Sequence, residues 1–141
     1  MVCVYCGSAT KVINSRKQRR GNGIWRRREC LACGAVFTSR ELADLSESLR
    51  VAQNSSKKKL APFTRDRLFI DIYESCRHRP TALGDAASLT QTVIDKLLAA
   101  TSNGVIERNE IVKASATILK RFDSAAATFY AAYHPIAAQD A

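Results

Sequence analysis

The chain has few of the residues on which catalysis most often depends. It holds only two histidines, His78 and His134, and neither has a nucleophile or a carboxylate at the spacing of a catalytic motif. Its six glycines form no Walker-type phosphate loop. We therefore do not expect an enzyme, and the sequence favours a protein that binds its partners without turning them over.

Long apolar runs are also missing. No apolar stretch approaches the roughly 18 residues of a membrane-spanning helix, and no signal-peptide pattern precedes Cys3. We expect a soluble, cytoplasmic protein with no membrane partner and with reduced cysteines. The 141 residues are 46% apolar and 25% charged, which is typical of one ordinary globular domain or two small ones.

Acidic residues are nearly absent from the first 40 positions. That segment holds nine Lys or Arg residues and one acid, Glu29, whereas residues 41–141 hold 13 basic and 12 acidic residues. Of the formal net charge of +9, the N-terminal segment therefore carries +8. Concentrated positive charge favours polyanionic partners, because binding releases their counterions.

Four of the five cysteines stand in two Cys-x2-Cys pairs, Cys3 with Cys6 and Cys30 with Cys33. Each pair can place two thiolates on one tight turn, and two such turns can form the tetrahedral site that Zn²⁺ prefers. Four thiolates leave no open coordination position, so we expect one structural zinc ion per chain. An iron–sulfur cluster or a pair of disulfides would also use four cysteines. The fifth cysteine, Cys76, is expected to be a small buried hydrophobe.

Basic residues cluster just before the second cysteine pair and on the segment that precedes it. The period of a strand predicts Arg26 and Arg28 on one face, with Trp25 and Arg27 on the other. Arginine binds phosphate oxygens and guanine edges in bidentate fashion, so a nucleic acid is the expected partner. The candidate contacts, to duplex DNA if the resemblance described below holds, are Arg16, Lys17, Arg19, Arg20, Arg26, Arg27 and Arg28. Alternatively, the run is only solvated charge. Packing across the small ribbon is the expected role of Trp25, with stacking on a base as the alternative.

Hydrophobic periodicity and turn residues predict the order of the elements. Short strands are expected at 12–13, 24–25 and 36–38, a helical turn at 41–45, a hairpin from 49–52 and 57–60, and a small strand at 105–106. Gly7 and Gly34 follow the second cysteine of each pair, where the turn favours positive φ. Four helices are expected, from Thr64 to Pro80, from Ser88 or Thr90 to Asn103, from Asn109 to Phe122, and from Ser124 to Tyr133.

Four segments closely resemble the NrdR family of bacterial transcriptional repressors of ribonucleotide reductase genes. They are Met1–Gly7, Lys11–Arg16, Arg26–Cys33 and Phe37–Glu41, and the resemblance extends more weakly to about residue 135. It implies an α+β fold, in which a zinc ribbon of three short antiparallel strands precedes an ATP-cone, a β-hairpin plus a four-helix bundle. The expected domains are a DNA-binding ribbon at 1–45, a cone for nucleotide binding and oligomerisation at 46–136, and a tail at 137–141.

The resemblance also implies ATP and dATP as effectors. The family's Val-x-Lys hairpin motif is here Val51-Ala52-Gln53, and the lysine that precedes a leucine is Arg67. Several positive donors must converge on a triphosphate, and the base would lie against Val51 and Phe63. The expected nucleotide contacts are Arg50, Val51, Gln53, Lys57, Lys58, Lys59, Phe63 and Arg67. Alternatively, the lysine run is only a solvated turn.

These expectations combine into a nucleotide-responsive repressor. The resemblance implies a homo-oligomer, dimeric or larger, in which nucleotide occupancy changes how subunits associate. Only some assemblies would then align two ribbons with paired operator sites. One alternative stays open: a zinc-ribbon adaptor that binds RNA polymerase or RNA without sensing nucleotides. ATP-cones also occur in ribonucleotide reductases, but the lack of catalytic motifs argues against an enzyme or enzyme fragment.

Overall fold

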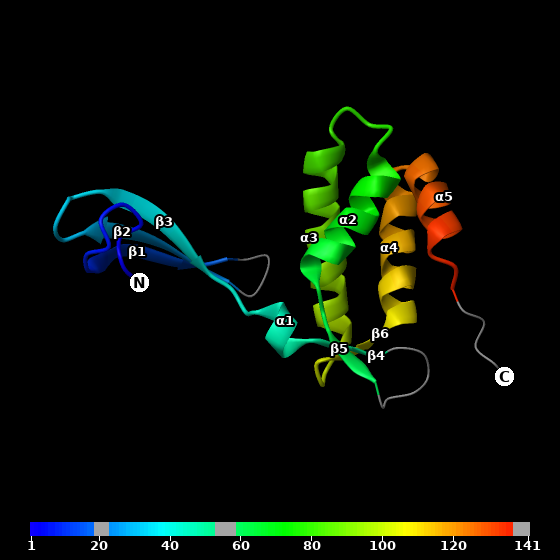
Figure 1. The fold of residues 1–141 in the computed structure, drawn as a ribbon, viewed down its shortest axis with the longest axis horizontal. Coiled ribbons are helices and arrows are strands. Elements are labelled where there is room, and N and C mark those ends of the chain that lie inside the picture. The colour runs from blue at the N-terminus through cyan, green and yellow to red at the C-terminus, as the bar shows by residue number, and fades with distance from the viewer. Residues whose placement is uncertain (19–22, 53–58, 137–141) are drawn as a thin grey trace. The chain divides into compact units, whose positions relative to one another are not determined.

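A computed structural model describes residues 1–18, 23–52 and 59–136. The chain divides into two compact units, Met1–Asp44 and Leu45–Ala141 (Figure 1). Arg19, Arg20, Gln53, Lys57 and Lys58, which were expected to bind DNA or nucleotide, lie outside the described residues, as does the tail at 137–141.

The first unit is a three-stranded antiparallel sheet in the order β1-β2-β3. Its strands are β1 (Thr10–Lys17), β2 (Ile24–Cys30) and β3 (Val36–Glu41). A bulge between Val12 and Asn14 shifts the register of β1 against β2. The three expected strands are confirmed, and Cys3, Cys30 and Phe37 form the small buried core of this unit.

The second unit is a small sheet at one end of a helical bundle (Figure 1). Its elements are α1 (Leu45–Ser48), β4 (Arg50–Ala52), β5 (Leu60–Pro62), α2 (Arg65–Cys76), α3 (Ala82–Ala100), β6 (Val105–Glu107), α4 (Arg108–Phe122) and α5 (Ser124–Tyr133). Strand β4 lies between an antiparallel β5 and a parallel β6. The expected α+β fold, with a ribbon followed by a hairpin and four helices, is confirmed.

The core of the second unit lies between helices α2, α3, α4 and α5. Helix α2 contacts α3 and α5, and α4 contacts the same two helices, so the bundle closes around one apolar interior. Leu68, Ile72 and Cys76 recur every four residues on α2 and are all buried. The prediction that Cys76 is a buried hydrophobe is therefore confirmed, and burial raises the pKa of its thiol.

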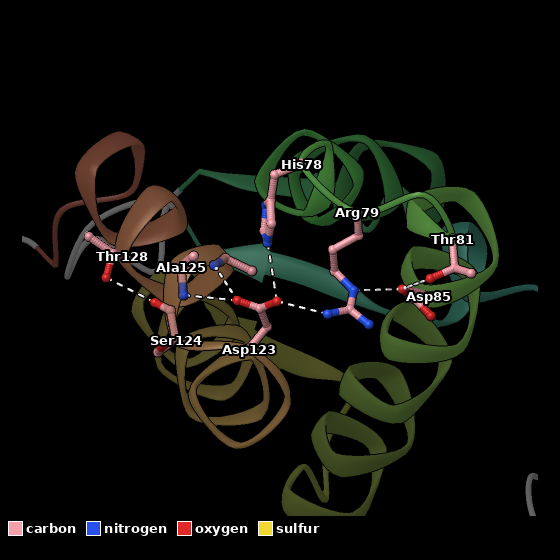
Figure 2. A network of polar contacts seen from close by, with 9 residues as sticks. His78, Arg79, Thr81, Asp85, Asp123, Ser124, Ala125 and Thr128 are labelled. Carbon is pink, nitrogen blue, oxygen red and sulfur yellow. Dashed lines mark hydrogen bonds and ion pairs between the residues drawn. The ribbon is translucent and has the colours of Figure 1, made fainter.

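A polar network ties the helices together at the end of the bundle opposite the hairpin (Figures 1 and 2). The carboxylate of Asp123 accepts hydrogen bonds from the backbone N–H groups of Ala125 (2.9 Å) and Ala126 (3.1 Å), which caps α5. Its other oxygen lies 3.1 Å from His78 Nε2 and 2.9 Å from Arg79 Nη1. Arg79 also donates to Asp85 at 2.9 Å, so one guanidinium joins α3 to the α4–α5 junction.

Three expected element boundaries are wrong. The helical turn expected at 41–45 is α1 at Leu45–Ser48, because β3 continues through Glu41. Helix α3 begins at Ala82, well before Ser88, whose hydroxyl donates to the carbonyl of Gly84 (3.1 Å) inside the helix. Helix α4 begins at Arg108, where Glu107 and Glu110 form a reciprocal capping box in place of the cap expected at Asn109.

Candidate functional site

Two tight turns bring four thiols together in the first unit. The Sγ atoms of Cys3, Cys6, Cys30 and Cys33 all lie within 4.8 Å of one another. In the sequence, 23 residues separate the two pairs. The antiparallel pairing of β1 with β2 brings the two turns together in space. Cys3 and Cys30 are buried, whereas Cys6 and Cys33 are exposed, so the cluster has an inner and an outer half.

The two turns repeat one local geometry. Gly7 and Gly34 have φ values of 72° and 70°, and their N–H groups donate to the carbonyls of Cys3 (3.0 Å) and Cys30 (3.2 Å). The positive φ expected at both glycines is confirmed. A side chain would strain this left-handed conformation, which glycine adopts without steric cost.

The thiol cluster fits a zinc ion. A tetrahedral site with Zn–S bonds of about 2.3 Å places sulfur atoms about 3.8 Å apart, and the Cys3–Cys33, Cys6–Cys30 and Cys6–Cys33 Sγ distances are 3.8, 3.5 and 3.6 Å. The four cysteines are thus arranged to bind one metal ion.

The register of the ribbon divides its basic residues between two faces. Residues directly paired across antiparallel strands point to the same side of a sheet. Trp25 is paired with Arg16 and Arg40, and the neighbouring position on the same face holds Arg27, two residues along β2. The other face carries Lys17, Arg26, Arg28, Cys30 and Phe37.

The second face is the inner one, because the buried core residues Cys30 and Phe37 belong to it. Its two arginines already have partners within the unit. Arg26 forms an ion pair with Glu41 at 2.8 Å, and Arg28 donates to Ser39 Oγ at 2.9 Å. Both side chains are only partly exposed.

The first face is open, and we call the surface formed by Arg16, Trp25, Arg27 and Arg40 the basic face. Its three arginines are exposed, and none forms an ion pair with another residue of the described ranges. Trp25 is half-buried between Arg16 and Arg40 in the register. Arg40 was not predicted as a contact. It lies three residues after Phe37 on β3, so strand alternation places its side chain on the face opposite to the buried Phe37.

A cavity of about 270 Å³ opens between the hairpin and the bundle in the second unit. It is lined by Val51, Phe63 and Arg67, three of the residues expected to bind nucleotide. Arg50 and Lys59 do not line it. The volume is slightly below the roughly 300–1,000 Å³ typical of small-molecule sites.

Three charged or titratable residues of this cavity were not anticipated: Arg108, Asp71 and His134. Arg108 follows β6, and the parallel pairing of Ile106 with Val51 brings it beside the hairpin. Neither Arg67 nor Arg108 forms an ion pair within the part of the chain that the structure describes. Two free guanidinium groups therefore face a cavity that also has apolar walls.

The fold and the site together define a zinc-ribbon protein, in which a four-thiol site supports a basic sheet and a mixed α+β unit follows. No helix in the described ranges combines the length and apolarity that a membrane crossing needs. Residues 1–41 match the family model of the transcriptional repressor NrdR-like N-terminal domain.

Relatives match over most of the chain. The transcriptional repressor NrdR of Tropheryma whipplei (strain Twist) is 35% identical over 127 residues, which cover 89% of this chain and 82% of that protein. The repressor of the same name from Syntrophus aciditrophicus is 32% identical over 135 residues, 95% of this chain and 82% of that protein. The chain belongs to the NrdR family of transcriptional repressors.

Proposed function

We propose that this protein is a nucleotide-responsive repressor that binds operator DNA of ribonucleotide reductase genes through its ribbon. The observation that carries the proposal is the presence, in one chain, of a basic face on a sheet that holds a four-thiol cluster and of a cavity lined by two arginines without ion pairs. The basic face suits a polyanion of extended shape, and the cavity suits a small phosphorylated ligand.

DNA binding is assigned to the ribbon at residues 1–45. The bound zinc would supply rigidity and no catalysis, because four thiolates would fill its coordination sphere. Arg16, Arg27 and Arg40 have no competing acidic partner among the described residues and can contact phosphates or guanine edges. Arg26 and Arg28, whose contacts lie within the unit, contribute to DNA binding mainly by stiffening the sheet.

Nucleotide binding is assigned to the ATP-cone at residues 46–136, with ATP and dATP as the effectors. The cavity supports this assignment, because Arg67 and Arg108 can bind phosphates while Val51, Phe63 and Ile111 supply apolar walls for a base. Nucleotide occupancy then sets which homo-oligomer forms, by as much as the nucleotide's affinity differs between assemblies. One ribbon offers a small interface, so operator binding uses at least two linked ribbons.

The test measures duplex affinity and molar mass with no nucleotide, with ATP and with dATP. We expect both quantities to respond to nucleotide in the natural protein. Arg67→Ala and Arg108→Ala should abolish the response while zinc content and nucleotide-free DNA binding stay unchanged. Arg121→Ala, an equal charge change on an exposed residue of α4 that does not line the cavity, is the control.

Three outcomes would contradict parts of this function. DNA or RNA binding that ignores nucleotide, with no heat of binding in calorimetry, would favour the adaptor over the sensor. Conversion of ATP to ADP at a rate that depends on the cavity residues would show that the protein is an enzyme. Recovery of the protein outside the cytoplasm in cell fractionation would contradict the repression of chromosomal genes.

A further inference from the structure

Asp71 is a carboxylate on the wall of a cavity that otherwise attracts anions. It lies on α2 one turn after Arg67, and both side chains line the cavity with Arg108. Its ion-pair partner is His134, whose Nε2 lies 4.0 Å from Asp71 Oδ1, too far for a hydrogen bond. No described residue donates a hydrogen bond to this carboxylate. The carboxylate can therefore accept a hydrogen bond from a ligand, and its side chain is 31% exposed.

The chemistry of a nucleoside triphosphate restricts what Asp71 can contact. A carboxylate repels phosphates, so these must bind at Arg67 and Arg108. The groups of an adenine nucleotide that can donate to a carboxylate are the ribose hydroxyls and the exocyclic amino group of the base. Aromatic and aliphatic side chains, Phe63 and Val51 among them, form the apolar part of the wall where the base would lie.

The spacing along α2 favours the ribose. Residues four apart project from the same face of a helix, about 6 Å apart along its axis. This is the scale of the separation between the 5′-phosphate and the ribose hydroxyls within one nucleotide. A phosphate held by Arg67 would thus place the sugar beside Asp71. Carboxylates also bind ribose hydroxyls in dinucleotide-binding folds.

We infer that Asp71 is a specificity-determining residue, which accepts a hydrogen bond from the ribose 2′-hydroxyl and makes the cavity prefer ATP to dATP. The inference rests on the proposed nucleotide function and adds to it which of the two nucleotides binds more tightly. Since dATP lacks the 2′-hydroxyl, it leaves the carboxylate without its donor. A hydrogen bond to a charged group, discounted for partial exposure, corresponds to a preference of about tenfold.

The test is calorimetric titration of the full-length protein with ATP, dATP and ITP, which lacks the exocyclic amino group. We expect the natural protein to bind ATP about tenfold more tightly than dATP. Asp71→Ala should weaken ATP binding by that factor and leave dATP binding unchanged, so that the ratio falls to about one. Asp71→Asn keeps the side-chain shape and reports the same loss of charge if the alanine variant folds poorly. Asp66→Asn, an exposed acid on α2 that does not line the cavity, is the matched control and should behave as the natural protein does.

Each contrary outcome has a distinct meaning. An unchanged ratio of ATP to dATP affinity in the Asp71 variants would overturn the inference while leaving nucleotide binding intact. If those variants lose the discrimination between ATP and ITP instead, the carboxylate contacts the base and the ribose assignment is wrong. If the natural protein binds none of the three nucleotides, the proposed nucleotide function fails, and the inference fails with it.

Discussion

Arg26 and Arg27 are adjacent on β2, carry the same charge and lie on opposite faces of the ribbon, so they form a matched pair for testing DNA binding. Arg27 is exposed on the basic face with no ion pair among the described residues, whereas Arg26 is paired with Glu41 at 2.8 Å. Each phosphate contact contributes about 0.9 to the slope of log affinity against log salt concentration. We expect Arg27→Ala to lower the slope by about 0.9 per ribbon, and Arg26→Ala to change it much less.

The effect grows when the whole basic face is neutralised. Replacing Arg16, Arg27 and Arg40 together by alanine should lower the slope by about 2.7 per ribbon. Over a fourfold rise in salt concentration, the variant should therefore lose about 40-fold less affinity than the natural protein. Fluorescence anisotropy with a short mixed-sequence duplex at several salt concentrations measures this, because the phosphate term does not depend on base sequence. Zinc content is measured on every variant to confirm that the ribbon is intact. The reasoning is refuted if Arg26→Ala flattens the slope as much as Arg27→Ala does.

Three other predictions concern the metal, the core and acid stability. Cys30→Ala should remove the bound zinc, measured by metal analysis of reduced protein, and abolish DNA binding while the helical signal in circular dichroism persists; full DNA affinity without metal would contradict the role of the thiols. Ile72→Ala, at a fully buried position, should cost about 2–5 kcal/mol in urea unfolding, whereas Ile70→Ala, at 55% exposure on the same helix, should stay within about 0.5 kcal/mol. The pKa of Asp123 is held below its usual range, first by the N–H of Ala126, so its contribution to stability is present above the unfolded pKa near about 4 and lost as pH falls below that value. The melting temperature of Asp123→Asn should therefore fall less steeply than that of the natural protein as the pH is lowered from about 5 to about 2. Parallel curves of melting temperature against pH would argue against the carboxylate's role.

The ribbon was predictable because its information is local. Cysteine spacing, glycine after each pair and strand alternation are short-range signals, and all three hold in the structure. The alternation of side chains along β2 also correctly predicted that Arg26 and Arg27 lie on opposite faces of the sheet. It could not say which face was inner, because that depends on Phe37 and the cysteine turns folding onto one side.

The second unit shows where sequence signals become ambiguous. Serine and threonine often cap helices, but Ser88 donates to the carbonyl of Gly84 inside α3, and Thr90 is fully buried within the same helix. The cap assignment of α3 was therefore wrong, whereas the apolar stripe of α2 was confirmed. Two lining residues of the cavity, Asp71 and His134, were not predicted for a different reason. They are 63 positions apart in the sequence and meet only through the packing of α2 against α5.

Strand β2 gives alternate positions to two separate tasks. The positions that face inward carry the thiol of Cys30 and the bonded Arg28, whereas the outward positions carry Trp25 and Arg27. Under the proposed DNA-binding function, a substitution in the outward series changes the surface that meets the duplex without disturbing the thiol cluster and the core of the inward face. The outward residues can then be exchanged one at a time, by evolution or by design, to alter the preference for DNA.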